Sequence, residues 1–148
     1  MPRYFIEVAY DGKNYSGFQV QKNANTIQAE VSRALEIFYK NRFELTGSSR
    51  TDAGVHARQN FFHFDIPFEL DEADKNVYNI SAILPGDIAV KRLFRVPDDA
   101  HSRFDAVSRV YHYYIYQRKD PFLRDTAFFY PFRLDIGRLN AAASTLMN

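Results

Sequence analysis

Hydrophobic residues between residues 3 and 96 alternate between the spacing of strands and that of helices, and this alternation constrains the fold more than any other feature. The first segment, Arg3 to Tyr10, is rich in Tyr, Phe, Ile and Val and predicts a strand. Apolar residues then recur at helical spacing from Ile27 to Phe38, which places one apolar face on a helix. The polar residues 11–24 between them contain two glycines and predict a loop.

Two residues are candidates for the N-cap of this first helix. Asn25 and Thr26 both carry a side-chain oxygen that can accept a hydrogen bond from the first turn. Gln28 stands three residues after Asn25, at the spacing of a capping box, so we expect its side chain to bond back to Asn25. The helix is expected to stop near Asn41.

The segments that follow complete the order β-α-β-β-α-β. They are expected to be a short strand over 43–47, a strand marked by Phe61, Phe62 and Phe64, a helix from Asp71 to the stop at Pro85-Gly86, and a strand over 88–96. This order is typical of a ferredoxin-like α+β fold, in which an antiparallel sheet carries both helices on one face. RNA-recognition modules share the topology with proteins of many other functions, so the topology alone assigns none.

Two further elements are expected beyond this β-α-β-β-α-β unit. The run RVYHYYIYQR at 109–118 is rich in β-prone residues and predicts a strand that extends the fold. Asp135 then caps an amphipathic helix whose apolar face runs from Ile136 to Leu146. Either this helix docks back on the domain, or the chain is a fragment of something longer. We favour the fragment, with one part over 1–100 and a second over 101–148.

The absence of cysteine from the 148 residues excludes disulfides, thiolate zinc sites and cysteine nucleophiles. The hydrophobic share of 46% is enough for a core in one domain of ordinary size. No apolar segment resembles a signal peptide or approaches membrane-spanning length, so we expect a soluble cytoplasmic protein without a membrane partner. With 19 basic and 18 acidic residues the net charge is +1, which neither indicates nor excludes a polyanionic partner.

The four histidines do not have the spacing of metal ligands, and each is expected to be a structural residue. They are His56, His63, His101 and His112. Ser48 and Ser49 are close in sequence to His56, but nothing fixes a nucleophile and a base there, and turn hydroxyls explain the serines better. The nucleotide-binding, zinc-protease and serine-hydrolase motifs do not occur in the sequence. We therefore do not expect a metal site.

The segment TGSSRTDAGVHARQ at 46–59 holds one carboxylate, Asp52, between two glycines. Arg50 stands two residues before it, and in an extended segment residues two apart point to the same side. The guanidinium is then able to hold the carboxylate ionised or to bind a phosphate beside it. The alternative is a surface turn with one ion pair, and spacing alone favours that turn.

The order of residues in GSSRTDAGVHA, at 47–57, resembles the loop signature of the tRNA pseudouridine synthase A family. Four other blocks resemble the same family in the same order and extend the likeness over nearly the whole chain. They are YDGKNYSGFQVQ at 10–21, TIQAEV at 26–31, LPGDIAV at 84–90 and AHSRFDAVSRVYHYYI at 100–115. A loop signature with four ordered companions is a specific signal, and it favours a functional site over the surface turn.

The resemblance implies an enzyme that isomerises uridine to pseudouridine at positions 38–40 of the tRNA anticodon arm, without a cofactor or a metal. The family's essential aspartate falls on Asp52, which would add covalently to the ribose or base, or remove a sugar proton. Arg50 would enter the RNA helix as the uridine leaves it and orient Asp52, and Tyr111 would stack on the flipped uracil.

Other basic residues fit a tRNA contact surface only as a group. They are Lys13, Lys22, Arg58, Arg103 and Arg109. The resemblance also implies a homodimer, and a second, similarly folded half that supplies another basic residue to the site. This sequence stops before such a half, so we expect the 148-residue piece to fold at least in part but to have little activity alone.

Two other classes of function stay open at this point. A non-catalytic RNA-binding module built on the same sheet would bind RNA without changing it. A structural interaction domain would use the tyrosine-rich strand as a partner-binding edge and would have no affinity for tRNA.

Overall fold

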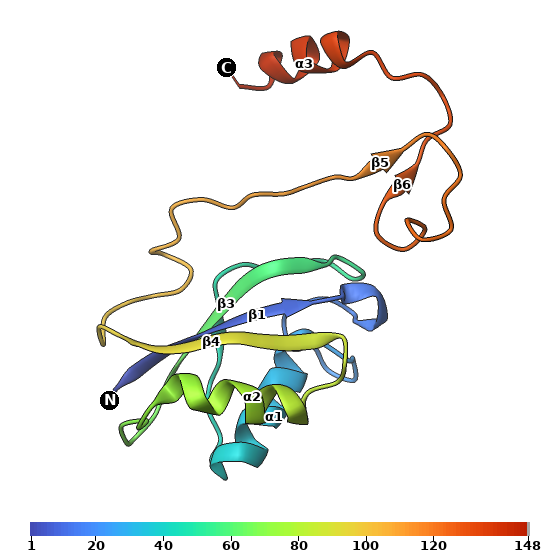
Figure 1. The fold of residues 1–148 in the computed structure, drawn as a ribbon. Helices are drawn as coiled ribbons and strands as arrows, with labels where there is room; N and C mark the ends of the chain where they lie inside the picture. Colours follow the sequence, from blue (N-terminus) through green and yellow to red (C-terminus); the bar gives the residue numbers. More distant parts are fainter. Residues whose placement is uncertain (148) are drawn as a thin grey trace. The chain divides into compact units, whose positions relative to one another are not determined.

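The computed structural model describes residues 1–147 and divides them into two compact units, Met1–Ser108 and the residues from Arg109 onward (Figure 1). The elements of the first unit are β1 (Arg3–Tyr10), the short 3₁₀ helix η1 (Gly12–Asn14), α1 (Ile27–Tyr39), β2 (Thr46–Gly47), β3 (Ala57–Asp65), α2 (Ala73–Ile83) and β4 (Ile88–Val96). The compact unit runs to Ser108, and the boundary of a functional part after residue 100 stays a prediction.

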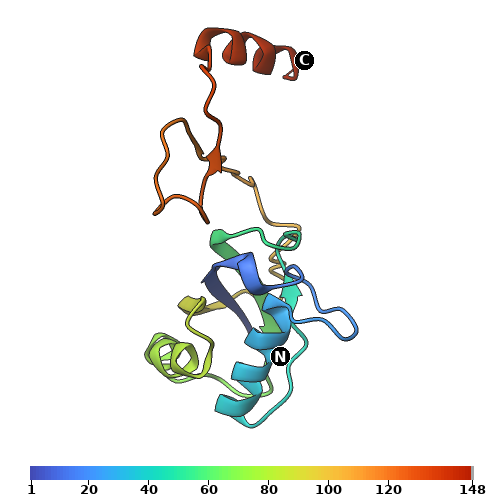
Figure 2. The ribbon, with the colours of Figure 1, turned by 90° about the vertical axis from the view of Figure 1, so that its right-hand side faces the viewer.

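The four strands of the first unit form one antiparallel sheet in the order β2-β3-β1-β4. Both helices, α1 and α2, lie on the same face of this sheet (Figures 1 and 2). The chain therefore places its first and third strands in the centre and its second and fourth strands at the edges. This arrangement confirms the predicted ferredoxin-like α+β fold.

The face of the sheet that carries the helices forms the core of the first unit. From β1, the side chains of Tyr4, Ile6 and Val8 are buried there. From β3, Phe62 stacks on Phe18 with the two ring centroids 4.4 Å apart. Burying a side chain of this size stabilises a fold by about 1.5–3 kcal/mol. Since Phe18 belongs to the loop over 11–24, that loop is anchored in the core.

Helix α1 begins at the second of the two predicted caps. The Thr26 Oγ1 accepts a hydrogen bond from the Ala29 N–H at 3.3 Å. The predicted capping box of Gln28 with Asn25 is wrong, because a cap at Thr26 moves Gln28 one position closer to the helix start. The Gln28 Nε2 instead donates to the carbonyl oxygen of Leu45 at 2.8 Å, and its Oε1 accepts from the N–H of Val20.

Two predicted elements are shorter than the sequence suggested. The strand predicted over 43–47 pairs with β3 only at Thr46–Gly47. Apolar side chains such as Phe43 and Leu45 pack on the core without forming a strand ladder. The helix predicted from Asp71 begins at Ala73, because Glu72 has a φ of 49°, in the left-handed region, which a right-handed helix does not accommodate.

The second unit holds two short parallel strands, β5 (Ile115–Tyr116) and β6 (Phe128–Phe129), and helix α3 (Ile136–Thr145). The Asp135 Oδ1 accepts from the Arg138 N–H at 3.0 Å, so the predicted cap is confirmed. No side chain from Arg109 to Met147 is buried. None of the helices within residues 1–147 combines the length and hydropathy that crossing a membrane requires.

The strand predicted over 109–118 is wrong for most of its length. Only Ile115–Tyr116 is paired, and its partner β6 is equally short. β-prone side chains favour an extended backbone, but a strand also needs a neighbour that takes up its N–H and C=O groups. Residues 109–114 are not part of a strand, and of their main-chain groups the Tyr114 carbonyl oxygen, next to β5, accepts from the Phe128 N–H at 2.7 Å.

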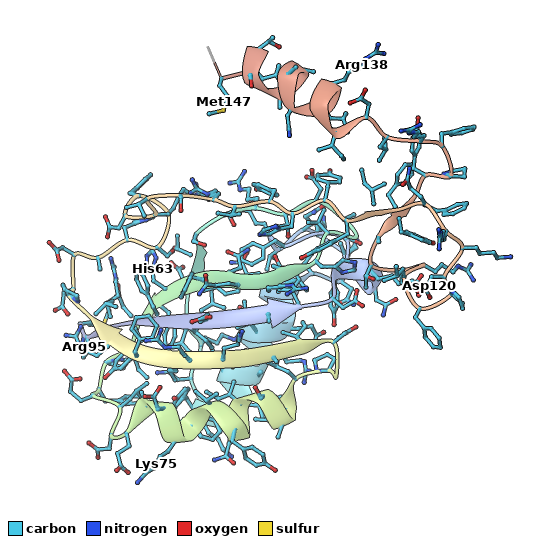
Figure 3. All side chains as sticks on the ribbon, turned by 45° about the horizontal axis from the view of Figure 1, so that its top comes forward. His63, Lys75, Arg95, Asp120, Arg138 and Met147 are labelled. Atoms are coloured by element: carbon cyan, nitrogen blue, oxygen red, sulfur yellow. The ribbon has the colours of Figure 1, made fainter. Side chains whose placement is uncertain are left out.

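The segment that follows β4 packs back on β3 through Ser102. Its hydroxyl lies 3.0 Å from the carbonyl oxygen of Thr46 and 2.8 Å from the Nδ1 of His63, which Figure 3 labels. The Ser102 N–H donates to the same nitrogen at 3.2 Å, so this Nδ1 is an acceptor and the neutral ring carries its proton on Nε2. The ring of His101 meets that of His63 edge-on. His63 is thus a structural residue, as predicted.

The buried position of His63 predicts a loss of stability in weak acid. Burial, helped by the Arg3 guanidinium, lowers the pKa of His63 from 6.5 to about 4. The unfolded chain binds the proton below pH 6.5 but the folded chain only near pH 4, so stability is complete above pH 6.5 and falls as the pH drops toward 4. The slope is about 1.4 kcal/mol per pH unit at most, and the total about 3 kcal/mol. Urea unfolding at several pH values measures it.

The control for this prediction is His63→Asn. The Asn Oδ1 occupies nearly the place of Nδ1 and still accepts from the Ser102 N–H, but the amide does not titrate. The difference in unfolding free energy between the two proteins should therefore shrink or reverse as the pH falls from 7 to 4.5. Parallel pH curves for wild type and variant would contradict the assignment to His63.

Candidate functional site

The loop over 46–59 starts with β2 and runs into the first residues of β3. It is held by main-chain hydrogen bonds on both sides of Asp52. The carbonyl oxygen of Thr51 accepts from the N–H of Phe18 at 3.0 Å. The N–H of Gly54 donates to the carbonyl oxygen of Tyr15 at 3.3 Å, and the Val55 N–H closes a turn on the carbonyl oxygen of Asp52. The loop over 11–24 therefore fixes the backbone that carries Asp52.

Two glycines of the loop over 11–24 make this close approach possible. A Cβ added to Gly12 would lie 2.0 Å from the carbonyl oxygen of Val55. Gly17 has a φ of +106°, and a Cβ there would lie 3.1 Å from the carbonyl oxygen of Thr51. The blocks at 10–21 and 47–57, which are far apart in sequence, are thus packed against each other through their backbones.

Arg50 and Asp52 are both exposed, while Thr51 between them is half-buried. This alternation agrees with the prediction that the two charged residues share one side of an extended segment. Within residues 1–147, neither side chain has a hydrogen-bond or ion-pair partner. The surface turn with one ion pair, which was the alternative to a functional site, therefore has no ion pair between these two residues in this structure. The carboxylate of Asp52 keeps its acceptor capacity for another group.

A buried polar network lies beneath this loop, and the sequence did not predict it. The Asn60 side chain of β3 joins the hydroxyls of Ser48 and Ser49 on one side to that of Tyr10 on the other. The Tyr10 hydroxyl then lies 2.8 Å from the Thr51 Oγ1. One signal was present, because Asn60 precedes Phe62 and Phe64 at strand spacing and so has to face the core.

His56 takes part in the loop as a structural residue. Its Nδ1 accepts from the Gly12 N–H at 3.1 Å and lies 2.9 Å from the Asp11 Oδ1. The hydroxyls of Ser48 and Ser49 both donate to the Asn60 Oδ1. Among residues 1–147, no three His, Asp or Glu side chains are grouped so that they can hold a metal ion.

The other predicted site residues are divided between the two units. Lys13, Lys22 and Arg58 are exposed and Arg103 is half-buried in the first unit, and Arg109 is exposed in the second. Tyr111 also lies in the second unit and is 65% exposed. Because these residues belong to two separate units, the stacking role of Tyr111 and the RNA contacts of the basic residues stay predictions.

Comparison with known proteins identifies the family of the chain. A family model described as tRNA pseudouridine synthase matches residues 6–105. A protein named tRNA pseudouridine synthase A from Porphyromonas gingivalis is 42% identical over 99% of this chain and 58% of its own length. Proteins of the same name from Bacteroides thetaiotaomicron and Staphylococcus aureus are 45% and 40% identical, over 99% and 95% of this chain.

The chain spans about half the length of the curated relatives it matches, 54% of the Bacteroides protein and 53% of the Staphylococcus protein. The matched region of the family model runs from within β1 to beyond β4 and includes the loop around Asp52 and the segment that packs on His63. Because this model covers more than half of the chain, the chain belongs to the tRNA pseudouridine synthase family.

Proposed function

We propose that the whole protein, as its gene encodes it, isomerises uridine to pseudouridine at positions 38–40 of the tRNA anticodon arm. The observation that carries the proposal is the position of Asp52. Its carboxylate is exposed and without a partner among residues 1–147, on a loop whose backbone is held at both ends by main-chain hydrogen bonds. Membership of the family and the names of its relatives support the choice of tRNA as substrate.

The reaction requires one group that can act on the nucleoside without a metal or a cofactor. The bond between C1′ and N1 breaks, the uracil turns, and C1′ bonds to C5, whose hydrogen leaves as a proton while N1 takes up a proton. A carboxylate can assist either by adding to the ribose or base, or by taking a proton from the sugar. Asp52 is able to do either because no protein group competes for its oxygens in the structure described here.

Arg50 and Tyr111 would act on the base rather than on the bond. A uridine inside a stem has to leave the stack before it can react, at a cost of a few kcal/mol. The planar guanidinium of Arg50, exposed two residues before Asp52, is suited to fill the gap and to pair with phosphates. The exposed ring of Tyr111 would stack on the uracil once it has turned out.

The proposal also covers the RNA-contacting residues, the oligomeric state and the location of the whole protein. The basic residues Lys13, Lys22, Arg58, Arg103 and Arg109 would contact the tRNA backbone as a group. The protein would act as a homodimer, and it would do so in the cytoplasm, where tRNA is modified.

The test uses the whole protein and tRNA transcripts labelled with tritium at C5 of uridine. Because C5 loses its hydrogen in the reaction, tritium enters the solvent only when pseudouridine forms. We expect release from a transcript with uridine at positions 38–40, and none when cytidine replaces those uridines. Release that is independent of these positions would contradict the proposed target. Salt-sensitive binding without any release would favour the RNA-binding module.

A further inference from the structure

We propose that Tyr10 and Thr51 are positioning residues. Their hydroxyls, held in place by Asn60, orient the Asp52 side chain toward its substrate. The inference rests on the proposed function and adds residues to it that lie beneath the loop and do not touch the substrate. It is drawn from the buried network between β1, β3 and the loop over 46–59.

Asn60 fixes the orientation of this network. The residue is 3% exposed. The N–H of Phe61 can only donate, so the atom of Asn60 that lies 2.9 Å from it is the carbonyl oxygen Oδ1. The same oxygen accepts from the hydroxyls of Ser48 at 2.7 Å and Ser49 at 3.1 Å. The amide nitrogen of Asn60 therefore has to face Tyr10.

In this orientation, Asn60 is connected to the loop around Asp52 through the Tyr10 hydroxyl. The Asn60 Nδ2 donates to the Tyr10 hydroxyl at 3.1 Å. The Tyr10 hydroxyl also lies 2.8 Å from the Thr51 Oγ1, and either oxygen can be the donor in this bond. Tyr10 is 5% exposed, so water does not replace this bond easily.

Thr51 is held by both its side chain and its main chain. Its hydroxyl bonds to Tyr10, and its carbonyl oxygen accepts from the Phe18 N–H at 3.0 Å. With Thr51 turned inward and fixed at two points, the residues on either side, Arg50 and Asp52, are directed outward. The network thus sets the direction of the Asp52 carboxylate without contacting it.

A reacting group has to be placed within a fraction of an ångström, and a displacement of about 1 Å lowers a rate by about 100-fold. Loss of the bond between Tyr10 and Thr51 should therefore lower kcat more than it changes the binding of tRNA. A purely structural network would instead lower the melting temperature and leave kcat of the folded protein unchanged.

The experiment measures kcat and KM of tritium release for the whole protein and its variants Tyr10→Phe, Thr51→Val and Thr51→Ser. We expect the first two to lower kcat by about 10- to 100-fold with KM changed by less than about twofold. Thr51→Ser keeps a hydroxyl at the same place and should restore most of the kcat that Thr51→Val loses. The double variant should lose no more than the worse single variant, because both remove the same bond.

The chain offers a matched control. Tyr39 of α1 accepts a hydrogen bond from the Asn76 Nδ2 at 3.1 Å, which is the same kind of bond that Tyr10 accepts from Asn60. Tyr39→Phe removes one phenol oxygen far from the loop and should leave kcat unchanged.

Asp52→Ala, measured in parallel, distinguishes failure of the proposed role of Asp52 from failure of this inference alone. If wild type releases no tritium, the proposed function fails, and if Asp52→Ala still turns over, the role of Asp52 fails and the inference fails with it. If Asp52→Ala is inactive but Tyr10→Phe and Thr51→Val keep the wild-type kcat, the inference alone is overturned. Should Tyr10→Phe not fold, the comparison of Thr51→Val with Thr51→Ser decides, and equal kcat values for these two would overturn the inference.

Discussion

Asp52→Asn is expected to abolish pseudouridine formation while tRNA binding persists. The amide has nearly the shape of the carboxylate but neither its charge nor its basicity, so it cannot act as a nucleophile or as a base. The backbone bonds that hold the loop are made by main-chain atoms and should survive the change. We expect single-turnover tritium release to fall by at least about 1000-fold.

The control for this variant is Asp74→Asn. Asp74 is an exposed carboxylate in the first turn of α2, on another element of the same unit. Its substitution removes the same charge and should leave both turnover and tRNA affinity as in wild type. Residual activity of Asp52→Asn above a few per cent would remove Asp52 from the centre of the mechanism, and so would an equal loss in Asp74→Asn.

Gly12→Ala is expected to have the largest effect on stability. The added Cβ would lie 2.0 Å from the carbonyl oxygen and 2.6 Å from the carbonyl carbon of Val55, which are both main-chain atoms. Neither backbone can rotate out of the way as a flexible side chain can, so one of the two loops has to move. We expect a loss of about 3 kcal/mol in the free energy of unfolding, measured with urea.

The matched control is Gly86→Ala in the turn before β4. A Cβ at Gly86 meets no atom within 4 Å, so this variant should change stability by no more than about 0.5 kcal/mol. Should Gly12→Ala be as stable as Gly86→Ala, the close packing of residue 12 against Val55 would be disproved. If it is destabilised, tritium release should fall with it, because the same shift displaces the loop around Asp52.

The elements with regular patterns were predicted well from the sequence. The bounds of β1 and β4 agree with the predicted strands, since buried and less buried side chains alternate along most of each strand. The predictions for Gln28 and for residues 109–118 failed for a different reason. The partners of these residues come from other segments, and local spacing carries no information about them.

The candidate site was predicted in part. The sequence placed Arg50 and Asp52 on one side of an extended segment, and their exposure agrees with that. It did not reveal the network of Tyr10, Thr51 and Asn60, because that network depends on how β1 and β3 are aligned. The pairing of these strands is regular up to Val8 opposite Asn60 and then shifts before Tyr10, an irregularity that no local pattern announces.

The main-chain bonds between the loop over 11–24 and the loop around Asp52 have an evolutionary consequence. Hydrogen bonds from the Phe18 N–H to Thr51 and from Gly54 to the Tyr15 carbonyl do not depend on which side chains the neighbouring positions carry. Exposed positions of the loop over 11–24, such as Ser16 and Gln19, are therefore free to diverge while the carboxylate of Asp52 keeps its place. A lineage can in this way change the surface it offers to different RNA substrates without rebuilding the position of its reactive group.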